Sequence, residues 1–217
     1  MNLQRFLSTA CLVLPLTVAS VSVRADGMGE MATFLRDVQS AQSSFTQVVT
    51  SPKRAGEATA RSKTSSGNFE FLRPNRFRFD YTKPFEQSIV ADGDTLWLYD
   101  LDLNQVTARK QKDALGSTPA ALIAAGADIQ ALAAVFDLKS EPASNGLEWV
   151  SALPRGKEGQ LQSVRVGFRQ GQLAALEILD SLGQRSLLTF TDWKPNAPLK
   201  SERFRFVAPA GVDVIRP

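Results

Sequence analysis

Hydrophobic and polar residues alternate along the chain between residues 67 and 109, and this alternation limits the fold more than any other feature of the sequence. It is clearest in two runs, 68–71 and 76–81, in which every second residue is aromatic. In an extended strand successive side chains point to opposite faces, so a period of two gives one apolar face and one wet face. The two runs therefore predict strands that are buried on one side only.

Further short runs of the same kind, bounded by turn residues such as the Asp-Gly-Asp at 92–94, extend this pattern. They cover residues 45–49, 87–91, 96–100, 105–109, 147–153, 161–169, 173–180, 185–193 and 203–207. The whole pattern predicts a meander of about eleven antiparallel strands. The polar stretch 51–66 carries almost no apolar bulk and predicts a mobile loop or an edge hairpin.

Three segments have helical periodicity instead. In residues 29–42 the apolar side chains recur at i, i+3, i+4 and i+7, namely Met31, Phe34, Leu35 and Val38. The Ser-Thr-Pro sequence at 117–119 predicts the start of a short helix over 120–125. Asp128 predicts the cap of a third helix, with an apolar face made of Ile129, Leu132, Ala133 and Phe136.

So many strands with one apolar and one solvent-exposed face, together with so few helices, predict a mainly β fold. In this fold one antiparallel sheet curls and the helices lie over its opening. Two kinds of interior fit this arrangement. The helices could cover an apolar cavity, or they could complete a solid core, which is the commoner use of such elements. Periodicity alone leaves both open.

Residues 1–25 have the features of a cleaved secretory signal peptide. Arg5 lies near the start, an uncharged apolar run follows from 6 to 23, and the Val-Arg-Ala sequence at 23–25 is a small-x-small cleavage site. A transmembrane anchor is the alternative, but Pro15 and the Ser/Thr content of the run make it a poor span. Residues 26–217 are then expected to form a single domain.

Removal of this segment changes the charge and the thiol content. The whole chain has a net charge of +3 and one cysteine, Cys11. Without Arg5, Arg24 and Cys11, 23 basic and 22 acidic side chains and no thiol remain. The mature chain therefore has no disulfide, and it lacks the concentrated basic surface that binding to nucleic acid requires.

The chain contains no histidine. This excludes serine-histidine and cysteine-histidine catalysis and every histidine-ligated metal site. The G-x-S-x-G, S-x-x-K, G-x-x-x-x-G-K-[ST] and G-x-G-x-x-G motifs are also absent from the sequence. A hydrolase that uses two carboxylates stays open, because the sequence does not show which of the 22 acids meet in space.

The most specific segment is 67–109, which reads GNFEFLRPNRFRFDY and then, from residue 84, PFEQSIVADGDTLWLYDLDLNQVTAR. Together with SFTQ at 44–47, GSTP at 116–119 and RFRF at 203–206, it resembles the LolA family of periplasmic outer-membrane lipoprotein carrier proteins. The resemblance covers nearly the whole mature chain. It implies an unclosed antiparallel β-barrel of about eleven strands covered by three α-helices around an apolar cavity for acyl chains, with no catalytic activity and no cofactor.

The resemblance also implies a site. The arginine of the family's R-P-N cluster corresponds to Arg73, whose guanidinium would hold a lid through the backbone at Leu35, Ile123 and Ala124. The candidates for the wall of the acyl-chain cavity are the aromatic residues Phe69, Phe71, Phe77, Phe79, Tyr81 and Trp97. Arg76 and Arg78 make the strand after the R-P-N cluster more basic than the family pattern.

The implied partners are lipoproteins directed to the outer membrane, an inner-membrane lipoprotein-releasing ABC transporter complex that supplies them, and an outer-membrane lipoprotein receptor that accepts them. The protein itself would be a periplasmic monomer with no nucleic-acid partner. A carrier or sensor of free lipid or glycolipid on the same fold is the alternative, since fold does not fix the ligand. A two-carboxylate hydrolase would differ from both in having a polar cleft instead of an apolar interior.

Overall fold

The computed structural model describes residues 26–53, 56, 59–114, 120–124, 129–156 and 161–216. The predicted signal peptide, with Cys11, and the predicted helix caps at 117–119 and 128 lie outside these residues. Within the described part of the chain, every helix is too short or too polar to span a bilayer.

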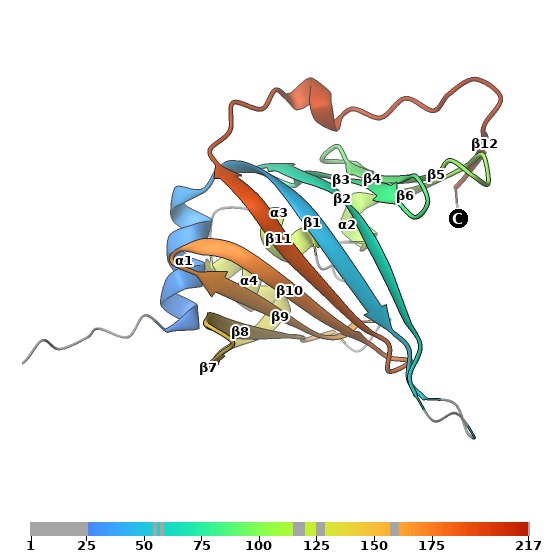
Figure 1. Cartoon of the computed structure of the whole chain (residues 1–217). Coiled ribbons are helices and arrows are strands. Elements are labelled where there is room, and N and C mark those ends of the chain that lie inside the picture. The colour runs from blue at the N-terminus through green and yellow to red at the C-terminus, as the bar shows by residue number, and fades with distance from the viewer. Residues whose placement is uncertain are drawn as a thin grey trace, which may run out of the picture.

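Twelve strands form one strongly curled sheet (Figure 1), in the order β12-β6-β5-β4-β3-β2-β1-β11-β10-β9-β8-β7. β1 (Ser40–Thr50) is central, and the strands on one side of it are β2 (Ser62–Leu72), β3 (Arg76–Lys83), β4 (Gln87–Ala91), β5 (Thr95–Asp100), β6 (Gln105–Lys110) and β12 (Asp213–Ile215). Those on the other side are β7 (Phe136–Ser144), β8 (Leu147–Pro154), β9 (Leu161–Arg169), β10 (Gln172–Asp180) and β11 (Arg185–Pro195). Neighbours are antiparallel except β12 and β6, which are parallel. The sheet is unclosed, with β12 and β7 at its two edges.

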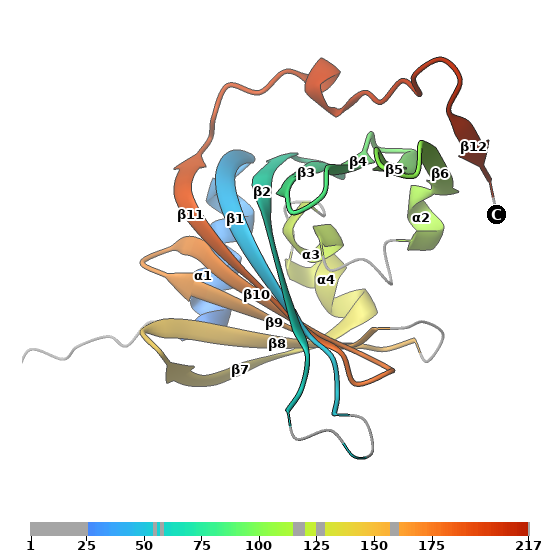
Figure 2. The ribbon, with the colours of Figure 1, turned by 45° about the vertical axis from the view of Figure 1, so that its right-hand side comes forward.

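The first strand lies at the centre of the sheet, because β1 pairs with β2 on one side and with β11 on the other. The β1–β2 hairpin reaches beyond the sheet (Figure 2) and stays paired out to Thr50 and Ser62. The polar stretch 51–66 is therefore partly strand. Its hairpin belongs to two interior strands and not to an edge, which corrects the prediction of an edge hairpin.

Three helices lie against the concave face of the sheet (Figure 1): α1 (Gly27–Asp37), α3 (Ala120–Ala124) and α4 (Ile129–Val135). The first packs on β7, β8 and β9, α3 packs on β2 and β3, and α4 packs on β7. The short helix α2 (Gln111–Ala114) follows β6 directly. The predicted architecture of a curled, unclosed sheet under lid helices is confirmed.

Helix α1 is shorter than predicted. Asp26 caps its start, with Oδ1 accepting a hydrogen bond from the Gly29 N–H group at 2.6 Å. The prediction carried the helix to residue 42, but Val38 has extended backbone angles and β1 begins at Ser40. Side-chain periodicity missed this end because Val38, although outside the helix, is still buried.

Two other predicted elements are also wrong. Residues 203–207 do not form a strand: a 3-10 turn, η2 (Ser201–Phe204), is followed by extended chain without strand pairing. Phe136 was placed on the apolar face of the third helix, but it pairs with Pro154 as the first residue of β7. Strand β7 was missed altogether, because it is an edge strand and most of its side chains are half-buried or exposed.

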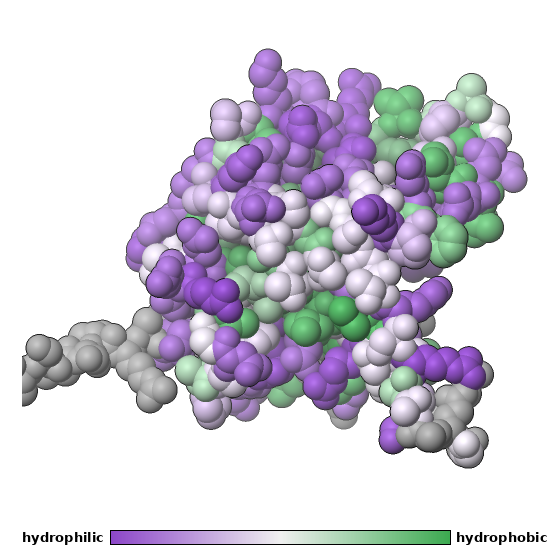
Figure 3. Space-filling view, viewed as in Figure 1, coloured by the Kyte–Doolittle hydropathy of each residue, from purple (hydrophilic) through white to green (hydrophobic). Residues whose placement is uncertain are grey.

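The last part of the chain, residues 196–216, crosses the outer face of the sheet and is called the C-terminal strap below (Figure 2). Phe204 of this strap is fully buried, and its neighbour Arg203 donates from Nε to Glu70 Oε2 at 2.8 Å. The strap ends as β12 beside β6. The rest of the outer face, around β1, β11 and β10, is largely hydrophilic or neutral with a few hydrophobic patches (Figure 3).

Candidate ligand-binding interior

Aromatic side chains cover the inner face of β2 and β3. Phe69, Phe71, Phe77 and Phe79 are each at most 5% exposed and belong to one core cluster with side chains of α1, α3 and α4. The ring centroids of Phe69 and Phe79 are 4.4 Å apart, and Phe77 meets Phe79 edge-on at 6.2 Å. The alternation that predicted these strands thus places all four predicted phenylalanines in one apolar interior.

Tyr81 continues this row toward the end of β3. Its ring contacts Phe45 at 5.0 Å, and its hydroxyl donates to Gln47 Oε1 at 2.8 Å. Burial raises the pKa of Tyr81 to about 12, so the hydroxyl stays neutral. Tyr81 is the one predicted wall residue that brings a polar atom to the inner face.

Trp97 does not belong to this interior. Its neighbours Leu96 and Leu98 take the inner face of β5, so the alternation puts Trp97 on the outer face. There its ring lies 5.3 Å from that of Phe206 in the C-terminal strap, and its Nε1–H group donates to Asp92 Oδ2 at 2.9 Å. The prediction grouped Trp97 with the phenylalanines by residue type, whereas its position in the alternation already indicated the other face.

Arg73 lies in the turn between β2 and β3 and is only 7% exposed. Its Nε–H group donates to the Val38 carbonyl at 2.8 Å, and its own backbone N–H group donates to the Gln39 carbonyl at 2.8 Å. The guanidinium carbon lies 5.3 Å from the ring centre of Phe34 and 5.2 Å from that of Phe71. Burial lowers the pKa of Arg73 from 12.5 to about 10, which leaves the side chain protonated at neutral pH.

The predicted lid positions lie close to this turn. Leu35 on α1 and Ile123 and Ala124 on α3 are each 1% exposed. The Ala124 carbonyl accepts a hydrogen bond from the Asn75 N–H group at 2.8 Å, and on the α1 side the Arg73 Nε–H group donates to the Val38 carbonyl, three residues after Leu35. The turn that carries Arg73 is therefore bonded through backbone groups to α3 and to the end of α1.

Two residues of this turn region escaped the sequence analysis. Asn75 has a φ angle of 63°, a left-handed conformation that asparagine tolerates better than most residues. Gln111, which is 1% exposed, donates from Nε2 to the Asn75 carbonyl at 2.6 Å. The asparagine of the R-P-N cluster was a usable signal for the turn, whereas nothing local to Gln111 indicated a partner 36 residues away.

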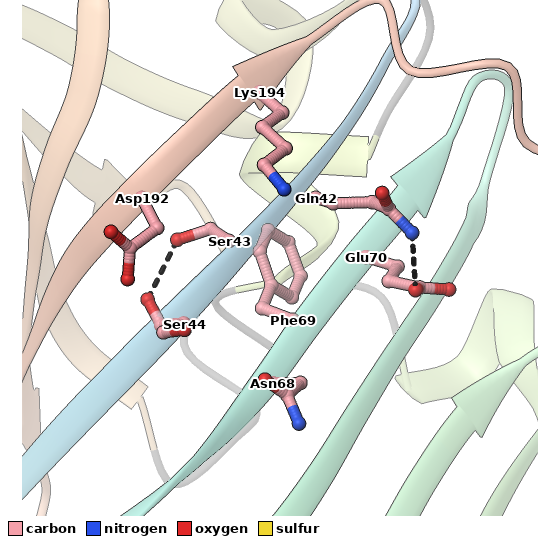
Figure 4. Close-up of a pocket in the computed structure, with 8 residues that line it drawn as sticks. All are labelled: Gln42, Ser43, Ser44, Asn68, Phe69, Glu70, Asp192 and Lys194. Atoms are coloured by element: carbon pink, nitrogen blue, oxygen red, sulfur yellow. Dashed lines mark hydrogen bonds between the residues drawn. The ribbon is translucent and has the colours of Figure 1, made fainter.

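Two hollows lie away from the aromatic interior. One, of about 200 Å³, is on the outer face (Figure 4) and is lined by Gln42, Ser43, Ser44, Asn68, Phe69, Glu70, Asp192 and Lys194. Glu70 accepts from Gln42 Nε2 there at 2.8 Å. The other, of about 600 Å³, lies between the base of the β1–β2 hairpin and Gln184. Both are lined mainly by polar residues, so neither suits an acyl chain.

The interior presents mainly apolar groups to a ligand. Its described wall consists of aromatic and aliphatic side chains, with Arg73 at one end and Tyr81 at the other. Among the described residues, no group of three histidine, cysteine or carboxylate side chains is placed to hold a metal ion. An apolar interior fits a long hydrocarbon ligand and differs from the polar cleft that a two-carboxylate hydrolase requires.

Known proteins resemble this chain over almost its entire length. Residues 36–207 match the family model described as outer membrane lipoprotein carrier protein LolA. A protein of Albidiferax ferrireducens named outer-membrane lipoprotein carrier protein is 60% identical over 196 residues, which are 88% of this chain and 92% of the relative. A protein of the same name from Neisseria meningitidis is 39% identical and covers 99% of this chain and 97% of its own length.

Solved structures share the fold at low sequence identity. An uncharacterized conserved protein from Thermus thermophilus has a TM-score of 0.51 at 14% identity, with 88% of this chain and 97% of that chain covered. A putative outer membrane lipoprotein-sorting protein domain from Vibrio parahaemolyticus has a TM-score of 0.50 at 11% identity, over 82% of this chain and 94% of that one. At such identities the likeness concerns the fold alone.

Proposed function

The chain belongs to the family of the outer membrane lipoprotein carrier protein LolA, and we propose that it carries lipoproteins across the periplasm by holding their acyl chains against the inner face of its sheet. The observation that supports this most directly is the continuous aromatic surface of β2 and β3 beneath α3, against which Phe34 of α1 also packs. A family of carriers has a non-enzymatic role, in keeping with a chain that contains no histidine.

The energetics explain why lipoproteins need such a surface. Each buried methylene contributes about 0.8 kcal/mol, so one acyl chain of about fifteen methylenes carries about 12 kcal/mol of transfer free energy. A protein with several such chains does not cross water unaided. Phenylalanine rings that would otherwise pack on one another can replace the contacts that the chains lose when they leave the membrane.

Binding requires the helices to move away from the sheet. Side chains of the protein itself cover much of the inner face, and Phe69, Phe71 and Phe77 are at most 1% exposed. Acyl chains therefore reach these rings only when α3, which packs on β2 and β3, and Phe34 of α1, which packs on Phe71, move away. The closed form competes with the ligand, and every 1.4 kcal/mol by which it is favoured lowers the apparent affinity about tenfold.

Arg73 is well placed to determine how strongly the closed form is favoured over the cargo-bound form. A hydrogen bond from a charged donor contributes about 1.5–3 kcal/mol, and the cationic contacts with Phe34 and Phe71 add to it. The bond from Asn75 to the Ala124 carbonyl joins the same turn to α3. Such a latch is strong enough to favour closure and weak enough to open when acyl chains are offered.

The two partners follow from the need to load and to unload. An inner-membrane lipoprotein-releasing ABC transporter complex would supply the cargo and the energy for opening. An outer-membrane lipoprotein receptor would accept the cargo when the carrier closes again. Closure driven by the latch makes the second step favourable without further energy.

The test is the substitution Arg73→Leu. We expect the variant to fold and to load lipoprotein, and we expect its transfer to the purified receptor to fall at least tenfold, because closure no longer competes with the bound cargo. Arg76→Leu is the matched control, since Arg76 is half-exposed on the neighbouring strand. Unchanged transfer by the Arg73 variant would show that the latch does not drive release.

A further inference from the structure

Strand β11 contains a β-bulge that turns one side chain inward. Ser44 pairs with Thr191 and Gln42 pairs with Lys194, so Ser43 faces two residues, Asp192 and Trp193. Asp192 has a φ angle of 54°, and Ser43 Oγ donates to the Thr191 carbonyl at 2.9 Å. Bulges of this kind often lie beside functional sites, where they re-aim a side chain.

The bulge changes which face of the sheet Trp193 occupies. On β11 the residues with even numbers, Ser186, Leu188 and Phe190, are buried on the inner face. Continued alternation would place Asp192 inside and Trp193 outside. The extra residue reverses this order, so Asp192 lines the outer hollow shown in Figure 4 and the indole of Trp193 packs against the apolar core.

Trp193 reaches the aromatic interior beside the latch. Its ring lies 6.1 Å from Phe34, 6.3 Å from Phe71 and 6.2 Å from Phe190. Phe34 and Phe71 are also the two rings that contact the guanidinium of Arg73. The indole is therefore next to the end of the interior that opens when the latch is released.

The indole Nε1–H group has no acceptor there. It is inaccessible to solvent, and none of the residues that the structure describes accepts a hydrogen bond from it. The Nε1–H group of Trp97, on the outer face, has Asp92 as its acceptor. A buried donor without a partner lowers stability by more than a typical hydrogen bond contributes, so such groups in folded proteins call for an explanation.

We propose that the Nε1–H group of Trp193 donates a hydrogen bond to an ester carbonyl of the acylated cargo. The inference rests on the proposed function and adds to it a polar contact with the cargo inside the apolar interior. An indole can only donate, and an ester carbonyl can only accept, so the two groups are complementary. A phenylalanine would fill the same space without an unsatisfied donor, so packing alone would not need the indole.

The experiment compares two cargoes and three proteins. The cargoes are a synthetic diacylglyceryl lipopeptide with two ester bonds and its dialkyl ether counterpart, which has the same chains and no ester carbonyl. The proteins are the native chain, Trp193→Phe, and Trp97→Phe as the matched control. Affinities are measured by isothermal titration calorimetry, and far-UV circular dichroism verifies that each variant folds.

We expect the ratio of ester affinity to ether affinity to be about tenfold higher in the native protein than in Trp193→Phe, which is the effect of one net hydrogen bond. Trp97→Phe should keep the native ratio. Equal ratios in all three proteins would overturn the inference while leaving the carrier function in place. If the native protein bound neither cargo, the proposed function itself would fail.

A second measurement follows ligand binding to the native chain by NMR spectroscopy. The indole N–H resonance of Trp193, assigned by its absence from the spectrum of Trp193→Phe, should move downfield when the native chain binds the ester lipopeptide. The ether lipopeptide should not cause this shift. If the ester cargo leaves the resonance in place, the indole does not bond to the carbonyl.

Discussion

Single polar side chains in this protein are held in unusual environments by a few specific bonds. Arg73 shows the principle, because burial lowers its pKa to about 10 and yet leaves it charged at neutral pH. Two aromatic faces and the Val38 carbonyl replace part of the water that the guanidinium loses. In the proposed latch, the cost of burying this charge offsets part of the stabilisation by these contacts, so that they can be broken.

Asp92 is a second residue of this kind, in the turn before β5. Its Oδ1 atom accepts from the N–H groups of Asp94 at 2.9 Å and Thr95 at 2.8 Å, and its Oδ2 atom accepts from Trp97 Nε1. Burial alone would raise the pKa of Asp92, but these hydrogen bonds outweigh it and hold the pKa below 3.8. The ionised carboxylate thus stabilises the fold above about pH 4, and this contribution is lost as the pH falls through the folded-state pKa.

Asp92→Asn should therefore lower the free energy of unfolding by about 1–2 kcal/mol at pH 7, because an amide cannot accept all three bonds. The difference in the free energy of unfolding between pH 7 and pH 2, measured by urea denaturation, should be smaller in the variant than in the native protein. Asp102→Asn, at an exposed position, is the control and should leave this difference unchanged. Identical acid dependence of the native protein and the Asp92 variant would contradict the assignment.

At the scale of elements, β3 separates an apolar inner face from a charged outer face. Phe77 is 1% exposed among the core rings, whereas Arg78 on the outer face pairs with Asp80 at 2.6 Å and donates to the Arg203 carbonyl at 3.4 Å. The extra basic character of this strand is therefore accounted for in part by contacts on the outer face. The same strand can be tested on both faces with one kind of substitution.

Phe77→Glu should destabilise the fold by at least about 3 kcal/mol and reduce lipopeptide binding by the folded fraction more than tenfold, because it places a carboxylate in the apolar wall. Arg76→Glu places the same carboxylate one residue away on the half-exposed outer face and should change both quantities little. Urea denaturation and a lipopeptide-binding assay measure the two effects. Unaltered affinity of the Phe77 variant would show that this part of the wall does not contact cargo.

The elements that could be predicted are those in which the alternation of apolar and polar residues directly matches the buried and exposed faces. The aromatic alternation at Phe69 and Phe77 fixed two strands and their inner face, and residues 87–91 and 161–169 form strands with the predicted bounds. The alternating Phe204 and Phe206 looked like a strand in the same way, but these rings anchor the C-terminal strap on the outer face.

The features that could not be predicted depend on contacts between distant segments. The bond from Arg73 to Val38 joins residues 35 apart, and the end of α1 is further fixed by Asn196, whose side-chain amide donates to the Asp37 carbonyl at 3.0 Å. The inward position of Trp193 follows from a bulge, and a single extra residue is not visible in a period-two pattern. The residues next to Val38 in the sequence do not indicate its bond to Arg73, and those next to Trp193 do not indicate its inward position.

The molecule as a whole consists of a sheet and a set of helices, and in the proposed mechanism the two separate when cargo enters. The Asn75 N–H group bonds across this boundary to the Ala124 carbonyl, whereas the amides of β1 bond within the sheet. On lipopeptide binding, hydrogen exchange at Asn75 should become at least about tenfold faster, since its acceptor moves away. The amides at the centre of β1 should keep their protection, which serves as the internal control. Unchanged exchange at Asn75 in the loaded protein would contradict an opening between sheet and helices.

The pairing of β1 with β11 also determines when the fold can be completed. Phe45 pairs with Phe190, so the central strand finds its second neighbour only after residue 195 of 217 has become free to pair. Contacts so distant in sequence make folding slow. A nascent chain of this topology therefore cannot complete its sheet until nearly all of it has emerged, and an incompletely folded chain can still pass through a narrow translocation pore.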